Sequence, residues 1–483
     1  DANIDTAPPA AISHRPVDLS LYSGIPAYVP PPAWSLDDLF AFAPSGSCGL
    51  DGLNADWLLH LHDDSLQALR TLLDLADTGC TPKAWTIARV TLIPKEGSLD
   101  RRPLSLCQFC YRLWARRHAS CLNAWINSFA PACLTGARKG TSAADTLWTV
   151  AGHLHDTVAS GQCRHVVSLD LEKCFEHFHL DSLRCVVNSL GLDSCAVALD
   201  IYCNLQRLLF IDGQPSDVIL SGNHLRGIPQ GCPLACVMCN LAAFGWHRAV
   251  SRSANSVLAW SYLDDRLLIA DDWDQLQAAL DASNDFDETM GPRLNLGKSF
   301  RGSVNKRRSR GWRFPRRGST LDAIPSTQAF RYLGTDVLLV RNKARKTASK
   351  RFRDFIARCD CVRHLPHAQR GAGVADSVSA LWLPGGGLPN TGQLGSMINA
   401  SASALAGAQR VKSGLKNRSR PIMHLTGPAS HFTHPTIAAV YASLLQFWRM
   451  RLLGKLSAAD WDLRWAHRRD ALWGPVFQLS SAL

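Results

Sequence analysis

Two acidic positions, far apart in the sequence, each stand at the end of an apolar, strand-like run. Val166-Val167-Ser168-Leu169 reads as a buried strand that ends at Asp170, and a helix is expected to follow through about residue 190. Residues 257–262 and 266–270 read as a strand pair, with Asp264-Asp265 at the turn between them. If these strands are neighbours in one sheet, the three carboxylates gather at one edge. This requirement constrains the fold more than any other feature of the sequence.

A group of carboxylates at one edge of a sheet suits hard divalent cations, since Mg2+ and Mn2+ prefer oxygen ligands. Two such ions about 3.5–4 Å apart stabilise both the attacking and the leaving oxygen when a group is transferred at phosphorus. Taken singly, each motif also has an ordinary interpretation, with Asp170 as a helix N-cap and Asp264-Asp265 as a turn. The sequence around the two motifs decides between these interpretations.

The composition fits a globular chain with a polyanionic partner. Of the 483 residues 46% are apolar, which is enough to bury a substantial core. Lysine and arginine outnumber aspartate and glutamate by 52 to 40, a balance that favours contact with nucleic acid. The sequence has no apolar run long enough to span a membrane and no signal peptide, so we expect no membrane partner and an intracellular location.

Four segments of the chain differ in their residue pattern. Residues 1–45 are rich in proline and alanine and read as an extended lead-in. Residues 46–160 are mainly helical in pattern, interrupted by the strand-like run Ala88–Pro94. Residues 161–340 alternate between strand and helix patterns, and residues 341–483 read as helical with glycine-rich loops. We expect these boundaries to separate structural units.

A basic window covers residues 305–353 and holds fifteen of the 52 lysines and arginines. Such clustering is typical of a surface that follows a phosphate backbone, because each neutralised phosphate releases counterions. A solvated face without a partner is the alternative. The candidates for nucleic-acid contact are Arg345, Lys346, Lys350 and Arg351.

Sixteen cysteines are scattered through apolar segments, and we expect reduced, buried thiols. Two metal-binding alternatives stay open. Cys232, Cys236 and Cys239 have a spacing that would suit an iron-sulfur cluster, although they follow a Pro-Gln-Gly segment in what reads as a helix. A zinc site with a spacing unlike the standard structural ones would use Cys359, Cys361, His364 and His367.

Three short motifs, in this order, resemble those of reverse transcriptases. Ser168 to Phe175 resembles motif A, Arg226 to Leu234 resembles motif B, and Tyr262-Leu263-Asp264-Asp265 resembles motif C. Residues 291–298 are similar to motif D and residues 330–334 to motif E. Residues 92–95, 102–106 and 136–140 look like the fingers motifs of non-LTR (LINE-like) retrotransposon polymerases, and residues 49–52 fit the entry segment of that lineage.

This resemblance, which covers roughly residues 45–340 closely, implies the α/β fold of a right-hand polymerase. Residues 46–160 would form the fingers, and residues 161–340 a palm with an antiparallel sheet and an interleaved fingers segment. Residues 341–483 would form a helical thumb and C-terminal region, with the basic window tracking the template-primer backbone. The implied activity is RNA-directed DNA synthesis, and the implied partners are an RNA template, a DNA primer and dNTPs.

The resemblance also implies a role for each matched residue. Asp170, Asp264 and Asp265 would bind the catalytic Mg2+ or Mn2+ ions, together with the backbone carbonyl of Leu171. Lys298 would be placed to protonate the leaving pyrophosphate, with a solvated lysine as the alternative. The implied nucleotide-binding residues are Lys95 and Arg102 at the triphosphate, Phe175 under the sugar, and Gln230 and Gly231 near the template base.

The sequence departs from the family pattern at two positions. Cys232 stands where the family often has serine and Glu176 where it often has aspartate, and neither supplies a metal ligand. No endonuclease, RNase H or zinc-knuckle signature is visible, so an endonuclease of such an element would lie outside this sequence. The location would be nuclear for a eukaryotic retrotransposon. The alternatives are an inactive, domesticated polymerase-like protein that binds RNA, and a group II intron maturase.

Overall fold

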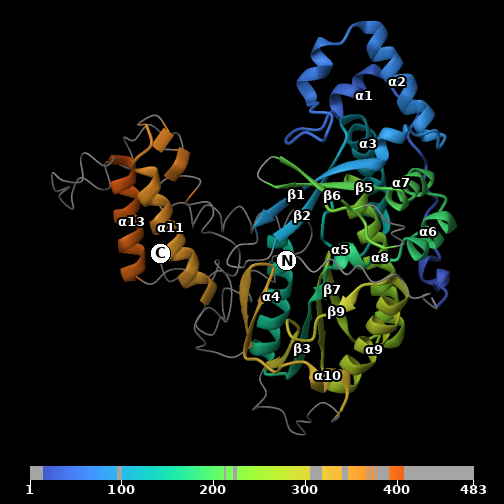
Figure 1. Cartoon of the computed structure of the whole chain (residues 1–483). Coiled ribbons are helices and arrows are strands. Elements are labelled where there is room, and N and C mark those ends of the chain that lie inside the picture. The colour runs from blue at the N-terminus through green and yellow to red at the C-terminus, as the bar shows by residue number, and fades with distance from the viewer. Residues whose placement is uncertain are drawn as a thin grey trace.

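The computed structural model describes residues 15–94, 101–211, 214–220, 226–304, 318–339, 346–366, 369–370, 372–374, 377 and 391–406. Two four-stranded sheets lie one above the other in Figure 1, with helices packed around them. The helices of the C-terminal part, α11 and α13, lie to one side in the same view.

The central sheet is antiparallel throughout and has the strand order β10-β3-β8-β7. Its strands are β3 (Arg164–Leu169), β7 (Leu258–Tyr262), β8 (Asp265–Ala270) and β10 (Phe300–Val304). The expected strand before Asp170 and the expected strand pair are therefore confirmed. The position of the turn was predicted one residue too late, because the turn is Leu263-Asp264 and Asp265 already belongs to β8.

A second sheet joins two distant parts of the chain in the order β2-β1-β5-β6. The expected strand run is confirmed as β1 (Ile87–Pro94), which pairs antiparallel with β2 (Arg101–Cys107) and parallel with β5 (Gln206–Ile211). β6 (Gln214–Leu220) pairs antiparallel with β5. Two short two-stranded sheets pair β4 (Leu171–Glu172) with β9 (Arg293–Leu294) and β11 (Ala329–Tyr332) with β12 (Thr335–Leu338).

Helices surround both sheets. The longer ones are α2 (Asp63–Asp77), α3 (Phe109–Phe129), α4 (Ala143–Ser160), α6 (Leu180–Ser189), α7 (Asp193–Cys203), α8 (Pro233–Ser253), α9 (Trp273–Met290), α11 (Lys346–Val362) and α13 (Thr391–Ala406). Short helices are η1 (Leu19–Tyr22), α1 (Leu36–Ala41), η2 (Ala55–His60), η3 (Lys83–Thr86), α5 (Cys174–His177) and α10 (Thr320–Ala323).

Both faces of the central sheet are buried, which explains why its strands are nearly continuous apolar runs. Val167 and Leu268 belong to the main core, which also contains the buried side chains of α8 and α9. Val166 and Leu267 point to the other face and join a second core with residues of α4, β11 and β12. Successive residues of a strand point to opposite faces, so a strand that is covered on both sides must be apolar throughout.

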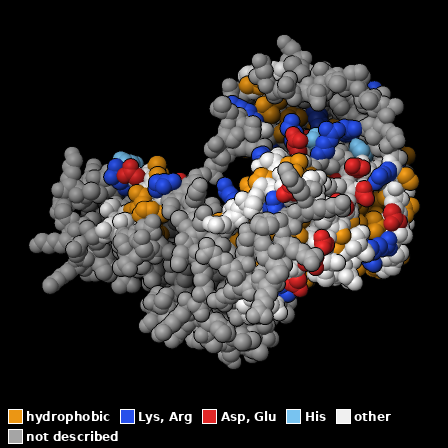
Figure 2. All heavy atoms as spheres, turned by 90° about the horizontal axis from the view of Figure 1, so that it is seen from below, with side chains coloured by type: hydrophobic (Ala, Val, Ile, Leu, Met, Phe, Trp, Pro, Cys, Tyr) orange, Lys and Arg blue, Asp and Glu red, His pale blue; other side chains and the backbone are white. Residues whose placement is uncertain are grey.

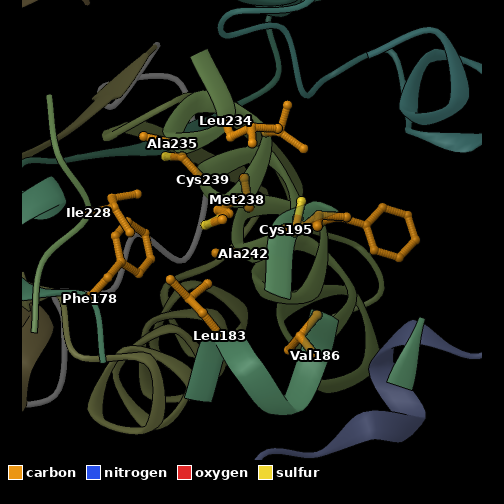
Figure 3. Packing of buried hydrophobic residues seen from close by; sticks show 14 of the residues in the cluster. Phe178, Leu183, Val186, Cys195, Ile228, Leu234, Ala235, Met238, Cys239 and Ala242 are labelled. Carbon is orange, nitrogen blue, oxygen red and sulfur yellow. The ribbon is translucent and has the colours of Figure 1, made fainter. Parts of the chain in front are cut away.

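Helix α8 lies at the centre of the main core. Figure 3 shows Met238 and Ala242 of α8 between Leu183 of α6 and Cys195 of α7. Its first turn begins with Pro233, whose missing N–H costs nothing at a helix start. Because α8 is apolar on nearly every side, it anchors the segment that precedes it, residues 226–232, against the core.

The helix predicted to run from Asp170 to about residue 190 is broken, and that prediction is wrong in this respect. α5 ends at His177 and α6 begins at Leu180. Between them, the carbonyl of Phe178 accepts a hydrogen bond from the N–H of Gly227 (2.8 Å), and the N–H of His179 donates to the carbonyl of Met290 (2.8 Å). These backbone groups bond to other segments of the chain, so they are lost to a helix.

The segment at residues 49–52 stabilises the start of α3. The residue before α3, Gln108, gives the helix no side-chain cap. Instead, the carboxylate of Asp51 accepts a hydrogen bond from the N–H of Phe109 (2.6 Å), and Gly49 lies so close that a Cβ there would be 2.6 Å from the carbonyl oxygen of Cys107. An acidic group at a helix N-terminus is favourable because it faces unpaired N–H groups and the positive end of the helix dipole.

A buried ion pair lies behind the central sheet. Arg266 of β8 donates to the carboxylate of Asp287 on α9 (2.6 Å), and the two side chains are only 4% and 6% exposed. The Arg266 guanidinium also lies 4.6 Å from the ring centroid of Trp246 on α8. The pair therefore joins β8 to both helices that cover this face.

On the face of the molecule seen in Figure 2, the charge is mixed in sign. Figure 2 shows lysine and arginine side chains beside aspartate and glutamate on the described part of this face, with no large area of a single sign. Among the described residues, no helix combines the length and apolar character needed to cross a membrane.

We predict that Asp287→Asn costs about 3–5 kcal/mol of the free energy of unfolding, because Arg266 would remain buried without a counter-charge. Replacing both partners, by Arg266→Met with Asp287→Leu, should recover most of that loss, since well-packed apolar residues often replace buried ion pairs without cost. Chemical denaturation of the three proteins measures the effect.

The matched control is Asp200→Asn, which removes a surface ion pair of similar length. Arg184 and Asp200 lie 2.7 Å apart, but their side chains are 29% and 67% exposed. This control should cost no more than about 1 kcal/mol. Equal losses for Asp287→Asn and Asp200→Asn would contradict the importance of the buried pair.

Candidate active site

The three carboxylates singled out by the sequence lie at one end of the central sheet. β3 pairs with β8 so that Leu169 lies opposite Arg266, and continuing this register by one residue places Asp170 beside Asp265. Asp264 stands at the tip of the β7–β8 hairpin, where its side chain is exposed. Two elements separated by more than ninety residues thus bring three acidic side chains to the same edge.

Acidic groups are crowded at this edge of the sheet, and their negative charges repel one another. Burial, together with the neighbouring charges of Asp264 and Asp170, raises the pKa of Asp265 to about 7. The pKa of Asp264 is also raised, because protein atoms around the hairpin tip restrict its hydration, although Arg102 and Arg266 oppose that change. A divalent cation at this edge would relieve the repulsion, and the donors are the hard oxygen atoms that such a cation prefers.

The geometry stops short of a complete metal site. Within the described ranges, no three His, Cys, Asp or Glu side chains come close enough together to hold a metal ion. Leu171, the residue expected to offer a backbone ligand, is buried and pairs with Leu294 in the short sheet of β4 and β9. The metal ligands therefore stay a prediction that rests on the register and on the charges.

The β7–β8 hairpin is held by a close contact with the segment at residues 133–136. The N–H of Thr135 donates to the carbonyl of Ser261 (3.0 Å), and the N–H of Ser261 donates to the carbonyl of Cys133 (3.1 Å). Leu263 in the turn adopts a left-handed φ of 56°, which is costly for a leucine. Any side chain at Gly136 would collide with the backbone nitrogen of Leu263, so only glycine fits there.

Arg138, in the fingers motif at residues 136–140, holds its own loop in place. Its guanidinium donates to the carbonyl of Pro131 (2.8 Å) and to the carbonyl of Leu134, and its Nε donates to Asn127 of α3 (2.8 Å). The motif at residues 136–140 thus supports the β7–β8 hairpin from the side. From the sequence alone, this motif was assigned only to the fingers.

The segment at residues 226–231 lies against the motif that follows Asp170. The N–H of Ile228 donates to the carbonyl of Phe175 (2.7 Å), and the amide of Gln230 donates to the carboxylate of Glu176 (2.6 Å). Gly231, at φ 108°, is close enough to β2 that a Cβ would lie 2.7 Å from the carbonyl oxygen of Ser105. Gln230 and Gly231 are therefore fixed between α5 and the second sheet.

The other candidates for nucleotide binding are placed unevenly. Arg102 is exposed on β2, and its charge opposes the rise in the pKa of Asp264, so it lies near that carboxylate. Phe175 is half-buried and packs against the main core. Lys298 is exposed in the turn between β9 and β10. Lys95 lies outside the described residues.

The candidates in the basic window are only partly described. Arg345 lies outside the described residues, and Lys346 and Lys350 belong to α11. Arg351 donates from its guanidinium to the carbonyl of Gly334 (2.6 Å), which joins α11 to the turn between β11 and β12. α11 also packs against α13 through a small core around Phe355.

The cysteine alternatives find other surroundings. Cys232 is buried, and its sulfur lies 3.0 Å from the hydroxyl of Tyr111 and accepts a hydrogen bond from Tyr202 (2.9 Å). Burial raises the pKa of the Cys232 thiol, which disfavours the thiolate that a metal needs. In the other set, Cys359 is buried in the core of α11 and α13 while Cys361 is exposed, and His367 lies outside the described residues.

Comparison with known proteins fixes the family. The model of the family "Reverse transcriptase (RNA-dependent DNA polymerase)" matches residues 93–337, about half of the chain. This range includes all three carboxylates, the hairpin and the whole central sheet, and it begins near the end of β1 in the second sheet. The chain therefore belongs to the reverse transcriptase family, and the class of enzyme and the right-hand polymerase fold expected from the sequence are confirmed.

Two curated relatives belong to mobile elements, which agrees with the expected non-LTR lineage. The retrovirus-related Pol polyprotein from the type-1 retrotransposable element R2 of Popillia japonica is 30% identical over 283 residues, covering 53% of this chain and 38% of that protein. The transposon TX1 uncharacterized 149 kDa protein of Xenopus laevis is 24% identical over 269 residues, covering 52% of this chain and 20% of that protein. The chain thus spans less than half the length of either relative.

Solved structures of apo telomerase from Candida tropicalis are also similar. One is 13% identical with a TM-score of 0.41, covering 71% of this chain and 62% of that one. A form truncated from the C-terminal domain is 13% identical with a TM-score of 0.38 and covers 55% of each chain.

Sequence analysis missed several residues that support the site. Asn295 and Ser299 contact the backbone of Asp170, although only Lys298 between them was singled out. The signal for Arg266 was present, because a charge inside an apolar strand requires a buried partner. The contacts of Gly136 and Gln230 depend on tertiary neighbours that no local pattern reveals.

Proposed function

We propose that this chain copies RNA into DNA by two-metal-ion nucleotidyl transfer at Asp170, Asp264 and Asp265. The observation that supports it most is the register of β3 against β8, which sets Asp170 beside Asp265, next to the hairpin tip that carries Asp264. The raised pKa of Asp265 supports a cation at this edge. We further propose Mg2+ or Mn2+ as the ions, and an RNA template, a DNA primer and dNTPs as the partners.

Each residue would contribute through its position. Asp170 and Asp264 would bind both ions, with Asp265 beside them and the Leu171 carbonyl as a backbone ligand. The ions would stabilise the charge that develops on the attacking 3'-oxygen and on the leaving pyrophosphate. Arg102 and Lys95 would bind the triphosphate, and Lys298 would donate a proton to the leaving group.

The remaining proposals concern the template and the location. Gln230, held by Glu176, and Gly231 would contact the template base and the nucleotide. The fingers, palm and thumb would divide near residues 46, 161 and 341, and Arg345, Lys346, Lys350 and Arg351 would lie near the nucleic-acid backbone. A nuclear location would follow for a eukaryotic element. The alternatives are a group II intron maturase and an inactive polymerase-like protein that binds RNA. A test of DNA synthesis is therefore necessary.

We predict that the wild-type chain extends a DNA primer on an RNA template with Mg2+ or Mn2+, and that Asp264→Asn lowers the rate by more than about a hundredfold, since the charge stabilisation at stake is several kcal/mol. Binding of the RNA–DNA hybrid should stay within about twofold, because the carboxylates do not contact the phosphates. Primer extension and filter binding measure the two quantities.

The matched control is Asp271→Asn, at the opposite end of β8. Asp271 is 74% exposed in its side chain and pairs with Arg164 at the surface. Its replacement should leave synthesis unchanged. If Asp264→Asn extends primers as fast as Asp271→Asn, the proposed site is wrong, and a wild type that binds hybrid without extending it would favour the RNA-binding alternative.

We also propose that Phe175 excludes ribonucleotides, because its ring would lie against the C2' position of the sugar. Its half-buried side chain is accessible enough for that role, in contrast to Phe178, which is fully in the core beside Ile228 (Figure 3). Phe175→Val should raise the ratio of rNTP to dNTP incorporation by roughly one order of magnitude or more, as expected when a steric penalty against the wrong substrate is removed.

Phe178→Val is the control for a merely structural phenylalanine. It should lower the melting temperature by creating a cavity, without changing the ratio of the two substrates. Single-nucleotide extension with rNTP and dNTP on one primer gives the ratio. An unchanged ratio in Phe175→Val, together with a lowered melting temperature, would place Phe175 with the core.

A further inference from the structure

A turn at residues 295–299 passes directly beside Asp170. It begins after β9, which pairs with β4 just past Asp170, and it ends before β10, which pairs with β3 just ahead of Asp170. The pair nearest Asp170 in these two strands is Phe300 with Ser168. Because the strands are antiparallel, Ser299, which precedes Phe300, lies at the level where β3 ends. Asp170 thus lies between Asp265 on one side and this turn on the other.

Three hydrogen bonds close a ring between the turn and Asp170. The N–H of Asp170 donates to the hydroxyl of Ser299 (3.1 Å), and this hydroxyl donates to the carbonyl of Asn295 (2.8 Å). The N–H of Asn295 donates to the carbonyl of Asp170 (2.9 Å). Both backbone groups of Asp170 are therefore bonded to one turn, and the Ser299 hydroxyl acts as donor and acceptor at once.

Ser299, a member of this ring, and its neighbour Lys298 differ in exposure. Ser299 is 0% exposed, so its hydroxyl is out of contact with bulk water. Lys298, the residue before Ser299, is exposed, and its N–H donates to both the carbonyl and the side-chain oxygen of Asn295 (3.2 Å each). The lysine proposed to act on the leaving group is thus built into the same hydrogen-bonded turn that holds the backbone of the proposed metal ligand.

We propose that Ser299 is a positioning residue for Asp170, and that it couples the placement of the Asp170 carboxylate to the turn that carries Lys298. This inference rests on the proposed function of Asp170 as a metal ligand. Groups that hydrogen-bond a ligating residue typically contribute about 10–100-fold to metal affinity or activity when they orient it. A serine that only fills space in the core would contribute to stability alone.

Ser299→Ala tests the proposal in two measurements on the full chain. The half-saturating Mg2+ concentration in primer extension should rise roughly tenfold, because the carboxylate is no longer held in place. The rise in melting temperature that Mg2+ produces in the enzyme bound to primer-template, without dNTP, should shrink. Ser299→Cys, which keeps a weaker hydrogen-bonding group of similar shape, should give an intermediate change in both and serves if the alanine variant fails to fold.

The matched control is Ser182→Ala. Ser182 is also buried, at 4% exposure, and its hydroxyl donates to a backbone carbonyl, that of Thr289 (2.7 Å), away from Asp170. This variant should lose stability with no change in the dependence on Mg2+. If the Ser299 variants depend on Mg2+ as Ser182→Ala does, the positioning role is excluded. A wild type that never extends primers would instead count against the proposed function, while the Mg2+-induced thermal shift still tests Ser299.

Discussion

The pairing of β3 with both of its neighbours is the constraint on which the rest of the site depends. β3 is an inner strand, with β8 on one side and β10 on the other, and its register fixes what lies beside Asp170. A shift of one residue would move every side chain of the strand to the opposite face. Such a shift is prevented because both faces are buried: Val167 faces the core of α8 and α9, and Val166 faces the core of α4.

Several unfavourable local features are concentrated around this edge, and two of them have a compensating contact. The left-handed turn at Leu263 fits because Gly136 leaves room for it. The charge of Arg266 behind the sheet is paired with Asp287. Burial and the crowding of acidic groups raise the pKa of Asp265, which marks a point where a cation would be stabilising.

The sequence predicted the elements that carry the chemistry because their signals are local. An apolar run before Asp170 and a strand pair around Asp264 are enough to predict β3, β7 and β8. The break at Phe178 could not be predicted, since it depends on hydrogen bonds from Gly227 and to Met290, residues distant in the chain. β2 was missed because its first residues, Arg101-Arg102-Pro103, lack the pattern of a strand. The candidate residues came from the family resemblance, and their contacts came from the structure.

The central claim is that the edge formed by Asp170, Asp264 and Asp265 binds the catalytic metal ions of a reverse transcriptase. Anomalous scattering from crystals of the enzyme with RNA template, DNA primer, a non-reactive dNTP analogue and Mn2+ tests it most directly. The account predicts two manganese peaks about 3.5–4 Å apart between the carboxylates of Asp170 and Asp264, next to the triphosphate. Peaks at other residues, or a bound nucleotide with no manganese at these carboxylates, would contradict it.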